Sequence, residues 1–263
     1  MHKFHFRNLC IFSHYLVLKM AENYCIMTSI YILYKKREDN FAIMTTSLFD
    51  ILGPITVGPS SSHTAGAIRI GLICRLLLGR DVKKAKITFY GSFAETFRGH
   101  GTDKAVLGGL LGFDTDDERI RDSLEIAKNR GVEFSITPSD EPTEHPNTVK
   151  IEAEADGQKI CIKGISVGGG VIRITEIEGH RVDVACRLDT LVVFNEDMAG
   201  VVAAVAGRLA YNGFNISNLT LLRDHKEGNA IMVIETDMPV DNETVKTLSE
   251  VPHVTKIIKI PKL

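Results

Sequence analysis

The segment GPSSSHTAGAIRIGLICRLLLG, from Gly58 to Gly79, places a run of hydroxyl side chains directly before an apolar helical pattern. Ile68, Leu72 and Leu76 recur at helical spacing and a glycine follows them, which predicts a helix over 64–78. Hydroxyls and free backbone N–H groups would converge at its N-terminus, where the helix dipole favours a carboxylate or a phosphate. The candidate anion ligands are Ser60, Ser61, Ser62 and Thr64. Ordinary N-capping by a single serine is the alternative interpretation.

A second segment, GSFAETFRGHGTD from Gly91 to Asp103, follows a strand-like apolar run at 85–90. It places His100 between two glycines, which let the backbone approach a ligand closely. A histidine suits a general acid or base because its unperturbed pKa lies near neutrality, and His63 of the first segment shares this property. A solvated loop histidine is the alternative that residue type alone favours for His100.

Together the two segments resemble the beta chain of iron-sulfur-dependent L-serine dehydratases. The resemblance runs from about Ser47 to the C-terminus and includes GISVGGG, Gly164 to Gly170. It implies that water is eliminated from L-serine to give pyruvate and ammonia, with a 4Fe-4S cluster and without pyridoxal phosphate. It also implies a partner, because the cysteine ligands of the cluster belong to a separate alpha chain, or to an alpha domain in fused versions.

The same resemblance assigns roles to the two polar segments. Ser60, Ser61, Ser62 and Thr64 would bind the carboxylate of serine, and Thr102 and Asp103 would complete the substrate-binding set. Removing the α-proton requires a base, and His100 is the preferred proton-handling residue. His63 is assigned a positioning or hydrogen-bonding role, although the sequence alone leaves open which of the two histidines is the base.

The cysteines support a cluster held elsewhere. Cluster-binding chains carry closely spaced cysteines, whereas no C-x-x-C or similar spacing occurs among the five cysteines of this chain. We therefore expect no metal ligand on this chain. Scattered cysteines are typical of a reducing cytoplasm, where buried thiols behave as small apolar side chains. The five are Cys10, Cys25, Cys74, Cys161 and Cys186.

Composition predicts a soluble globular protein. The 263 residues are 44% hydrophobic and 24% charged, with a formal net charge of -2, so neither nucleic acid nor a membrane is the expected partner. The sequence contains no run of 18 apolar residues, so no membrane-spanning helix is predicted. Residues 1–43 precede a family-like opening at Met44, which we interpret as the natural start. We expect poor order before it, and no cleavage site typical of a signal peptide follows its apolar stretch.

The pattern after Met44 predicts an α+β protein of two domains. The first, 44–186, is expected to be a mixed α/β serine dehydratase beta domain, similar to the allosteric substrate-binding domains of some phosphoglycerate dehydrogenases. Helices are predicted at 64–78, 103–111 and 117–130, the last closed by Gly131. Strands are predicted at 85–90, 132–137, 148–155, 159–165 and 171–177, and prolines at 138, 142 and 146 indicate an exposed loop.

The glycine run at Gly168, Gly169 and Gly170 has two interpretations. It resembles a phosphate-cradling nest, but it lacks a following Lys-Ser/Thr and precedes a strand instead of a helix. A bulge or a close backbone approach within the sheet is the preferred alternative. The family resemblance allows this run to lie near the substrate.

The second domain, 187–263, is predicted to have the βαββαβ order of a ferredoxin-like fold. Its stretch NEDMAGVVAAVAGRLAYNGFNISNL is similar to amino-acid-binding ACT modules, which often bind ligands between two copies. That similarity assigns Asp197, Gly200 and Asn215 to an effector site, with serine as the first candidate ligand and with self-association through this module. Helix capping by Asp197, close packing at Gly200 and a turn at Asn215 are the alternatives.

The resemblance therefore predicts the beta subunit of a cytoplasmic L-serine ammonia-lyase that acts only with an alpha chain. The alternative function, from another class, is a non-catalytic sensor that binds serine and carries out no reaction. The paired histidine segments favour the enzyme, because a sensor needs only contacts to an anion.

Overall fold

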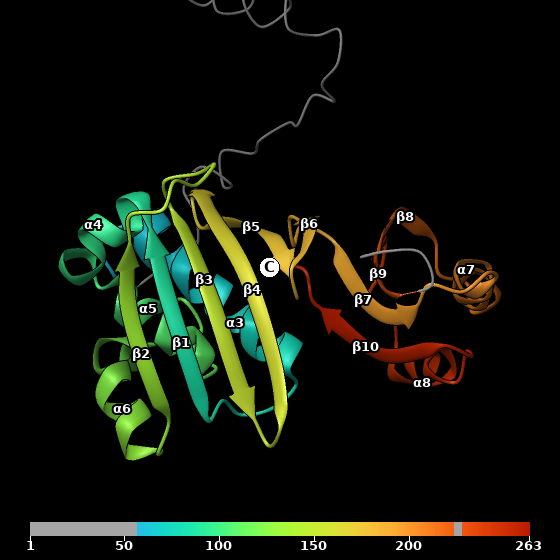
Figure 1. Ribbon diagram of the computed structural model, residues 1–263, viewed down its shortest axis with the longest axis horizontal. Coiled ribbons are helices and arrows are strands. Elements are labelled where there is room, and N and C mark those ends of the chain that lie inside the picture. The colour runs from blue at the N-terminus through green and yellow to red at the C-terminus, as the bar shows by residue number, and fades with distance from the viewer. Residues whose placement is uncertain (1–56, 224–227) are drawn as a thin grey trace, which may run out of the picture. The chain divides into compact units, whose positions relative to one another are not determined.

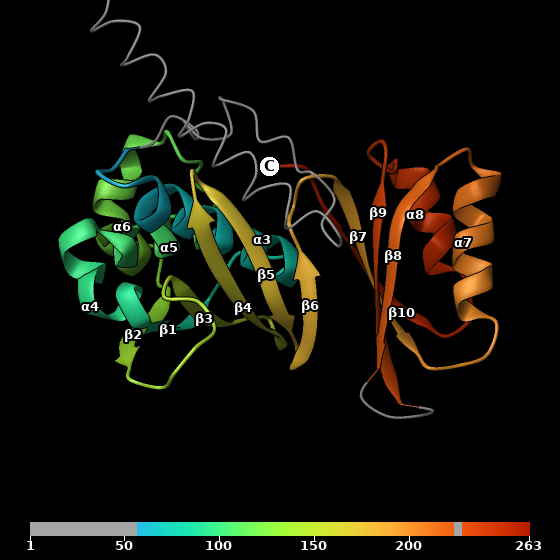
Figure 2. The same ribbon diagram turned by 90° about the horizontal axis from the view of Figure 1, so that it is seen from above.

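The computed structural model describes residues 57–223 and 228–263, which form two β-sheets, each with helices on one face (Figure 1, Figure 2). The predicted extension 1–43 and the predicted start at Met44 lie outside the described residues. Within those residues the protein is mixed α+β, as the sequence predicted. No helix of the described ranges is both long enough and apolar enough to cross a lipid bilayer.

The first sheet has six strands in the order β2-β1-β3-β4-β5-β6. Strands β1 and β2 are parallel, and all other neighbours are antiparallel. Period-two alternation explains the sheet: in β3, Val149 and Ile151 are fully buried, whereas Lys150 and Glu152 point to the other face. The strands are β1 (Lys84–Tyr90), β2 (Glu133–Ser139), β3 (Thr148–Ala155), β4 (Gln158–Gly168), β5 (Val171–Ile177) and β6 (His180–Val184).

Helices cover one face of this sheet and leave the other open (Figure 1). Helices α3 and α5 pack unusually closely, because a Cβ on Gly109 would lie 2.1 Å from the carbonyl oxygen of Ile68. The helices are the π-helix η1 (Ser61–Gly66), α3 (Ala67–Leu78), α4 (Gly91–His100), α5 (Thr102–Leu110), the 3₁₀-helix η2 (Glu118–Asp122) and α6 (Ser123–Asn129).

The predicted helix over 64–78 is confirmed, and Gly79 ends it with a φ of 75°. Its start differs, because Ser61–Gly66 forms a π-helix that continues directly into α3. Such wide turns occur frequently at functional sites. The predicted helix over 117–130 likewise divides into η2 and α6, because the Asp117 side chain accepts the Arg119 N–H and tightens the first turn.

The largest departure from the sequence prediction is α4, because no helix was predicted there and a solvated loop was the alternative interpretation for His100. Phe93 and Phe97 stand four residues apart and both contact Phe89 of β1, with ring centroids at 5.9 and 5.4 Å. This apolar side packs α4 onto the sheet and stabilises it as a helix. His100 is its last residue, and Gly101 with a φ of 67° ends α4 and precedes α5.

Three smaller differences concern strands. β6 was not predicted, and β4 extends three residues beyond its predicted end at 165. Pro138 lies inside β2 and not in the loop that follows. It is tolerated because β2 is an edge strand that pairs only with β1, so the missing N–H removes no essential bond. The glycine run is a bulge followed by a turn, as preferred: the β4–β5 register shifts between Ser166 and Gly168.

The second sheet has the βαββαβ order that the sequence predicted, with strands arranged β10-β7-β9-β8 and all neighbours antiparallel. Asp241 caps α8 by accepting the Thr244 N–H at 2.6 Å. Helix α7 begins at Val201 and not at Asp197, because Gly200 has a φ of 92° and cannot continue a helix. The elements are β7 (Asp189–Glu196), α7 (Val201–Tyr211), β8 (Ile216–Arg223), β9 (Asn229–Thr236), α8 (Asn242–Ser249) and β10 (Val254–Ile260).

Candidate functional site

The two histidines singled out from the sequence lie against each other. The ring centroids of His63 and His100 are 4.7 Å apart, with an angle of 40° between the ring planes. His63 comes from η1 and His100 from the end of α4, so the fold joins the two polar segments. The buried ring of Phe93 meets His63 edge-on at 5.1 Å and gives the pair an apolar wall.

Serine hydroxyls contact both ring nitrogens of His63. Its Nδ1 lies 3.0 Å from the Ser62 hydroxyl and 3.5 Å from the Ser60 hydroxyl, and its Nε2 lies 3.2 Å from the Ser92 hydroxyl. Ser60 also accepts the His63 N–H at 3.2 Å, so this serine caps the helix as the alternative interpretation held. Capping and contact with the imidazole occur together. Ser61 is half-buried in η1.

The environment of His63 favours its neutral form. Burial lowers the pKa of this imidazole, and positive charge on His100 lowers that pKa further. A charge on one ring disfavours a second charge on a ring this close, which adds to the effect of burial on His63. A neutral imidazole is the state in which a histidine accepts a proton.

A cavity of about 320 Å³ opens beside His100, and we call it the His100 cavity. Three cationic side chains line it: Arg98, Lys104 and Arg121. Backbone at Gly58, Gly99 and Gly101 forms another part of its wall, and the remaining lining residues are Val57, Pro59, Thr64 and Ile120. His63 and the three serines are not among the residues that line the cavity.

Several buried polar atoms around the histidines have no hydrogen-bond partner among the described residues. They are Thr64 Oγ1, His100 Nδ1 and Thr102 Oγ1, and the side chains of Thr64 and Thr102 are 1% and 0% exposed. Because buried polar groups are normally paired, unpaired ones at one place indicate a missing ligand or water. Asp103 lies next to them; burial raises the pKa of its carboxyl, which accepts the Lys104 N–H at 2.8 Å.

The third motif, 164–170, contacts the first. A Cβ on Gly66 would lie 2.1 Å from Ser166 Oγ, so only glycine lets η1 approach β4 this closely. Arg69 of α3 donates from Nη1 to the carbonyl oxygen of Gly170 at 2.6 Å and fixes the β4–β5 turn against the same helix. Ser166 Oγ is a further buried hydroxyl with no partner among the described residues.

Comparison with known proteins agrees with this geometry. The family model described as serine dehydratase beta chain matches residues 47–177. The probable L-serine dehydratase beta chain of Bacillus subtilis (strain 168) is 42% identical over 214 residues, which cover 81% of this chain and 97% of that protein. The L-serine dehydratase beta chain of Peptoniphilus asaccharolyticus is 36% identical over 203 residues, or 76% and 91% of the two chains.

This chain belongs to the serine dehydratase beta-chain family. The resemblance drawn from the two polar segments is thereby confirmed. A second kind of relative also occurs: the D-3-phosphoglycerate dehydrogenase of Bacillus subtilis (strain 168) is 26% identical over 201 residues. Those residues cover 73% of this chain and 37% of that enzyme.

The described part of this beta chain offers no site for an iron-sulfur cluster. No three His, Cys, Asp or Glu side chains gather there in a way that could hold a metal ion. Cys74 and Cys186 are buried, and burial raises the pKa of both thiols, that of Cys186 to about 12. Burial also raises the pKa of the half-buried Cys161. Metal ligation needs a thiolate, so these residues do not fit the cluster that the family resemblance implies.

The three predicted effector residues of the beta chain do not meet within one copy. Asp197 and Gly200 lie between β7 and α7, where Asp197 accepts from Arg223 Nη1 at 3.1 Å. Asn215 immediately precedes β8, and the strand register places it at the opposite end of the sheet. It donates to Asp237 at 2.6 Å. Asp197 does not cap α7, because no side chain forms a cap hydrogen bond at the start of that helix.

Sequence reasoning missed several residues around the histidines. Ser92 and Phe93 belong to the second segment and contact His63 directly, so their position beside a candidate histidine was the available signal. Lys104 and Arg121 carried no such signal, because exposed cations in helical stretches are normally solvated. Only the fold brings them to the cavity.

Proposed function

We propose that this chain is the beta subunit of an L-serine ammonia-lyase that converts L-serine to pyruvate and ammonia together with a cluster-bearing alpha chain. Membership of the serine dehydratase beta-chain family supports the reaction class. The observation that carries the proposal is the contact between His63 and His100 at the edge of a cation-lined cavity. Two coupled imidazoles suit an elimination that must remove a weakly acidic α-proton.

His100 is assigned the proton-handling role. It lines the cavity, and its buried Nδ1 has no partner within the described ranges. His63 lies behind it with a hydroxyl at each ring nitrogen, which suits a group that orients and holds His100. A proton on His100 disfavours a second proton on His63, so His63 stays neutral while His100 is charged.

The hydroxyl-rich turn supports binding of the serine carboxylate. Ser60, Ser61, Ser62 and Thr64 surround the start of the π-helix, and Thr64 both lines the cavity and carries an unpaired hydroxyl. Thr102 and Asp103 stand at the start of α5, on the other side of His100. A ligand between these two helix starts would satisfy buried groups that otherwise have no partner.

The alpha chain is required for a physical reason. Hydroxide is a poor leaving group, and a four-iron cluster with an open iron position supplies Lewis-acid assistance when it is present. The described cysteines of this chain do not fit that cluster, so we assign its ligands to the alpha chain. The steps assigned to this chain are binding of the carboxylate and movement of one proton. The free cysteines fit a cytoplasmic protein.

Regulation is assigned to the second sheet, whose βαββαβ order is that of the ACT modules it resembles. Asp197 and Gly200 of one copy and Asn215 of another would complete one effector site, because a single copy keeps them apart. Self-association would therefore be a condition for binding an effector. L-serine is the proposed effector.

The direct test is anaerobic pyruvate release from L-serine by this chain alone, by a candidate alpha chain with its cluster, and by both together. We expect turnover only in the mixture. In the mixture, His100→Ala should lower turnover on the order of 10²–10⁴-fold, as loss of a general base does, and should leave the cluster absorbance unchanged. His253→Ala, which changes an exposed histidine of the second sheet, is the matched control and should retain turnover.

The same mixture separates the roles of the two histidines. A positioning role predicts that His63→Gln, which retains a hydrogen-bonding side chain, keeps more turnover than His63→Ala. His100→Gln should remain as inactive as His100→Ala, because an amide cannot take up the proton. The reverse pattern would make His63 the base, and unchanged turnover in both His100 variants would remove His100 from the mechanism.

A second candidate function is a non-catalytic serine sensor, which the similarity to a D-3-phosphoglycerate dehydrogenase over 201 residues favours. A sensor would bind L-serine with no alpha chain present and would give no turnover in any mixture. Retained serine binding by the His100→Ala variant, combined with that result, would favour the sensor over the dehydratase.

A further inference from the structure

The His100 cavity carries more positive charge than a zwitterionic amino acid neutralises. Arg98, Lys104 and Arg121 line it, and none of them forms an ion pair with a described residue. The positive charges of Arg98 and Lys104 act on the carboxyl of Asp103, yet Asp103 forms no ion pair with either side chain. The residues that line the cavity therefore include three cations and no carboxylate.

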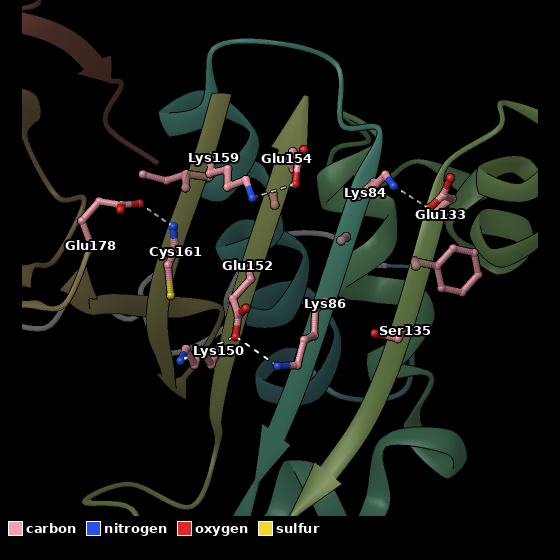
Figure 3. Close-up of a pocket in the computed structure, with 14 residues that line it drawn as sticks. Lys84, Lys86, Glu133, Ser135, Lys150, Glu152, Glu154, Lys159, Cys161 and Glu178 are labelled. Atoms are coloured by element: carbon pink, nitrogen blue, oxygen red, sulfur yellow. Dashed lines mark hydrogen bonds and ion pairs between the residues drawn. The ribbon is translucent and has the colours of Figure 1, made fainter. Parts of the chain in front are cut away.

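This lack of pairing is not general in the domain. The open face of the first sheet forms a larger groove of about 690 Å³, which we call the sheet-face groove. Its lysines are paired across strands: Lys84 with Glu133 at 3.0 Å, Lys86 with Glu152 at 3.5 Å and Lys159 with Glu154 at 3.4 Å (Figure 3). The cations of the cavity therefore differ from those of the groove in lacking ion pairs with described residues.

Uncharged groups at the cavity also favour an anion. Thr64 Oγ1 and His100 Nδ1 are buried without partners in the described part of the chain, and both residues line the cavity. Helix α5 begins directly after Gly101, with no side-chain hydrogen bond to cap it. A helix N-terminus presents free N–H groups and the positive end of the dipole. All three kinds of group satisfy the oxygens of an anion.

We propose that the His100 cavity binds a small oxyanion with two negative charges, either a phosphate group or a dicarboxylate. Serine brings only one carboxylate, so a dianion neutralises more of the positive charge of these three cations, and Arg and Lys side chains bind such oxygens through charge-assisted hydrogen bonds. The inference concerns the same cavity as the proposed function, because Thr64 and His100 line it, so a bound dianion would compete with serine there.

Calorimetric titration of the full chain at pH 7.5 tests the proposal, with inorganic phosphate, malonate and acetate as probes. We expect saturable binding of at least one dianion, at least tenfold tighter than acetate and weakened by added sodium chloride. Tighter phosphate identifies a phosphate group as the ligand chemistry, and tighter malonate identifies a dicarboxylate. Equal binding of acetate and both dianions, or no saturable binding, overturns the proposal.

A pair of charge-matched variants locates the site. Arg98→Gln/Lys104→Gln/Arg121→Gln and Lys84→Gln/Lys86→Gln/Lys159→Gln each remove three positive charges, the first from the cavity and the second from the sheet-face groove. We expect the cavity variant to lose at least tenfold in dianion affinity and the groove variant to stay within twofold of the parent. Equal losses would show a general charge effect and overturn the proposal.

Two further outcomes keep the test decisive. The single variant Arg121→Gln, an exposed change, should lose several-fold in affinity and replaces the triple variant if that one fails to fold. If the parent binds no dianion while the cavity variant weakens association with the alpha chain, the cations contact the partner and the proposal is wrong. Failure here leaves the pyruvate assay unaffected, so the two hypotheses fail independently.

Discussion

The His100 cavity and the sheet-face groove contain similar residues and differ in how these residues are paired. Both are rich in cationic side chains, and the groove is the larger at about 690 Å³ against about 320 Å³. In the groove each of Lys84, Lys86 and Lys159 faces a carboxylate across a strand boundary (Figure 3). In the cavity the cations lack such partners among the described residues, and buried hydroxyls remain unsatisfied. Unsatisfied groups, and not size or charge content, identify the candidate site.

The backbone beneath the two regions differs in the same sense. The groove lies on regular strands whose outward side chains alternate with buried ones, an arrangement that satisfies the backbone within the sheet. The cavity lies where helices begin and end, at the start of η1, the end of α4 and the start of α5. Helix ends leave backbone groups available to a ligand, whereas strands in a sheet do not.

The largest effect on stability is expected from Gly66→Ala, which tests whether the site depends on close backbone approach. The new Cβ would lie 2.1 Å from Ser166 Oγ and 2.7 Å from Ser166 Cβ, so η1 and β4 must separate. Overpacking of this kind costs about 3 kcal/mol. Urea denaturation measures the loss. The control Gly99→Ala has no atom within 4 Å of its new Cβ and should leave stability nearly unchanged.

A rescue experiment sharpens this first prediction. Ser166→Gly removes both atoms that the new Cβ would meet, so the double variant should regain part of the stability that Gly66→Ala loses. Equal stability of Gly66→Ala and Gly99→Ala would show that the first and third motifs are not closely packed. The site would then no longer depend on the β4–β5 turn.

A smaller loss is expected from Ser60→Ala, because this serine has two roles. Its hydroxyl accepts the His63 N–H at 3.2 Å as the helix cap and lies 3.5 Å from His63 Nδ1. Loss of an N-cap costs about 1 kcal/mol, measured by urea denaturation. Ser61→Ala is the matched control, since the Ser61 hydroxyl makes no hydrogen bond with a described residue. Equal losses would mean that neither serine acts as a cap.

Periodicity predicted most of the first sheet and the helices α3 and α5, because buried and exposed positions alternate strictly in strands such as β3 and apolar residues recur at helical spacing in α3. It failed at α4, for which no helix was predicted. Phe93 and Phe97 carry the helical spacing, and packing on β1 outweighs the low helix propensity of the glycines. The π-helical start of the first motif has no sequence signal.

The candidate site was only half predictable. His63 and His100 were identifiable because each stands among hydroxyls and glycines, whereas their contact across 37 residues of sequence became visible only in the fold. The cations were not, since Lys104 and Arg121 belong to different helical stretches and look like solvated residues. Asn215 shows the converse limit. The similarity to ACT modules grouped it with Asp197, but strand order separates the two within one copy.

A pH series tests whether burial and the charge of His100 lower the pKa of His63. The folded pKa of His63 lies below its unfolded value of about 6.5, so the unfolded chain binds more protons near and below that pH. The contribution of His63 to stability is therefore complete above pH 6.5 and is lost as the pH falls toward the folded pKa. Relative to His63→Asn, the parent should lose stability between pH 7.5 and 5.5. His145, which also has a lowered pKa, is present in both chains and cancels.

The partner ring supplies the control for this series. Positive charge on His100 contributes to the lowered pKa of His63, so His100→Asn should reduce the pH dependence without abolishing the part caused by burial. Indistinguishable pH profiles for the parent and His63→Asn would show that His63 is not buried as described. A profile unchanged by His100→Asn would show that the rings do not interact.

The smallest expected effect is the change in folding stability when three cations are removed. Its sign should differ between the groove and the cavity, so it bears directly on the comparison of the two regions. Removing the three groove lysines breaks surface ion pairs and should destabilise the fold by less than Ser60→Ala does. Removing the three cavity cations relieves mutual repulsion, so the same loss of charge should leave stability unchanged or slightly raised. Both differences should shrink as sodium chloride is added, because salt screens attraction and repulsion alike. Thermal unfolding midpoints at low and high salt measure both stability changes. If both triple variants lose stability, the cavity cations are paired after all.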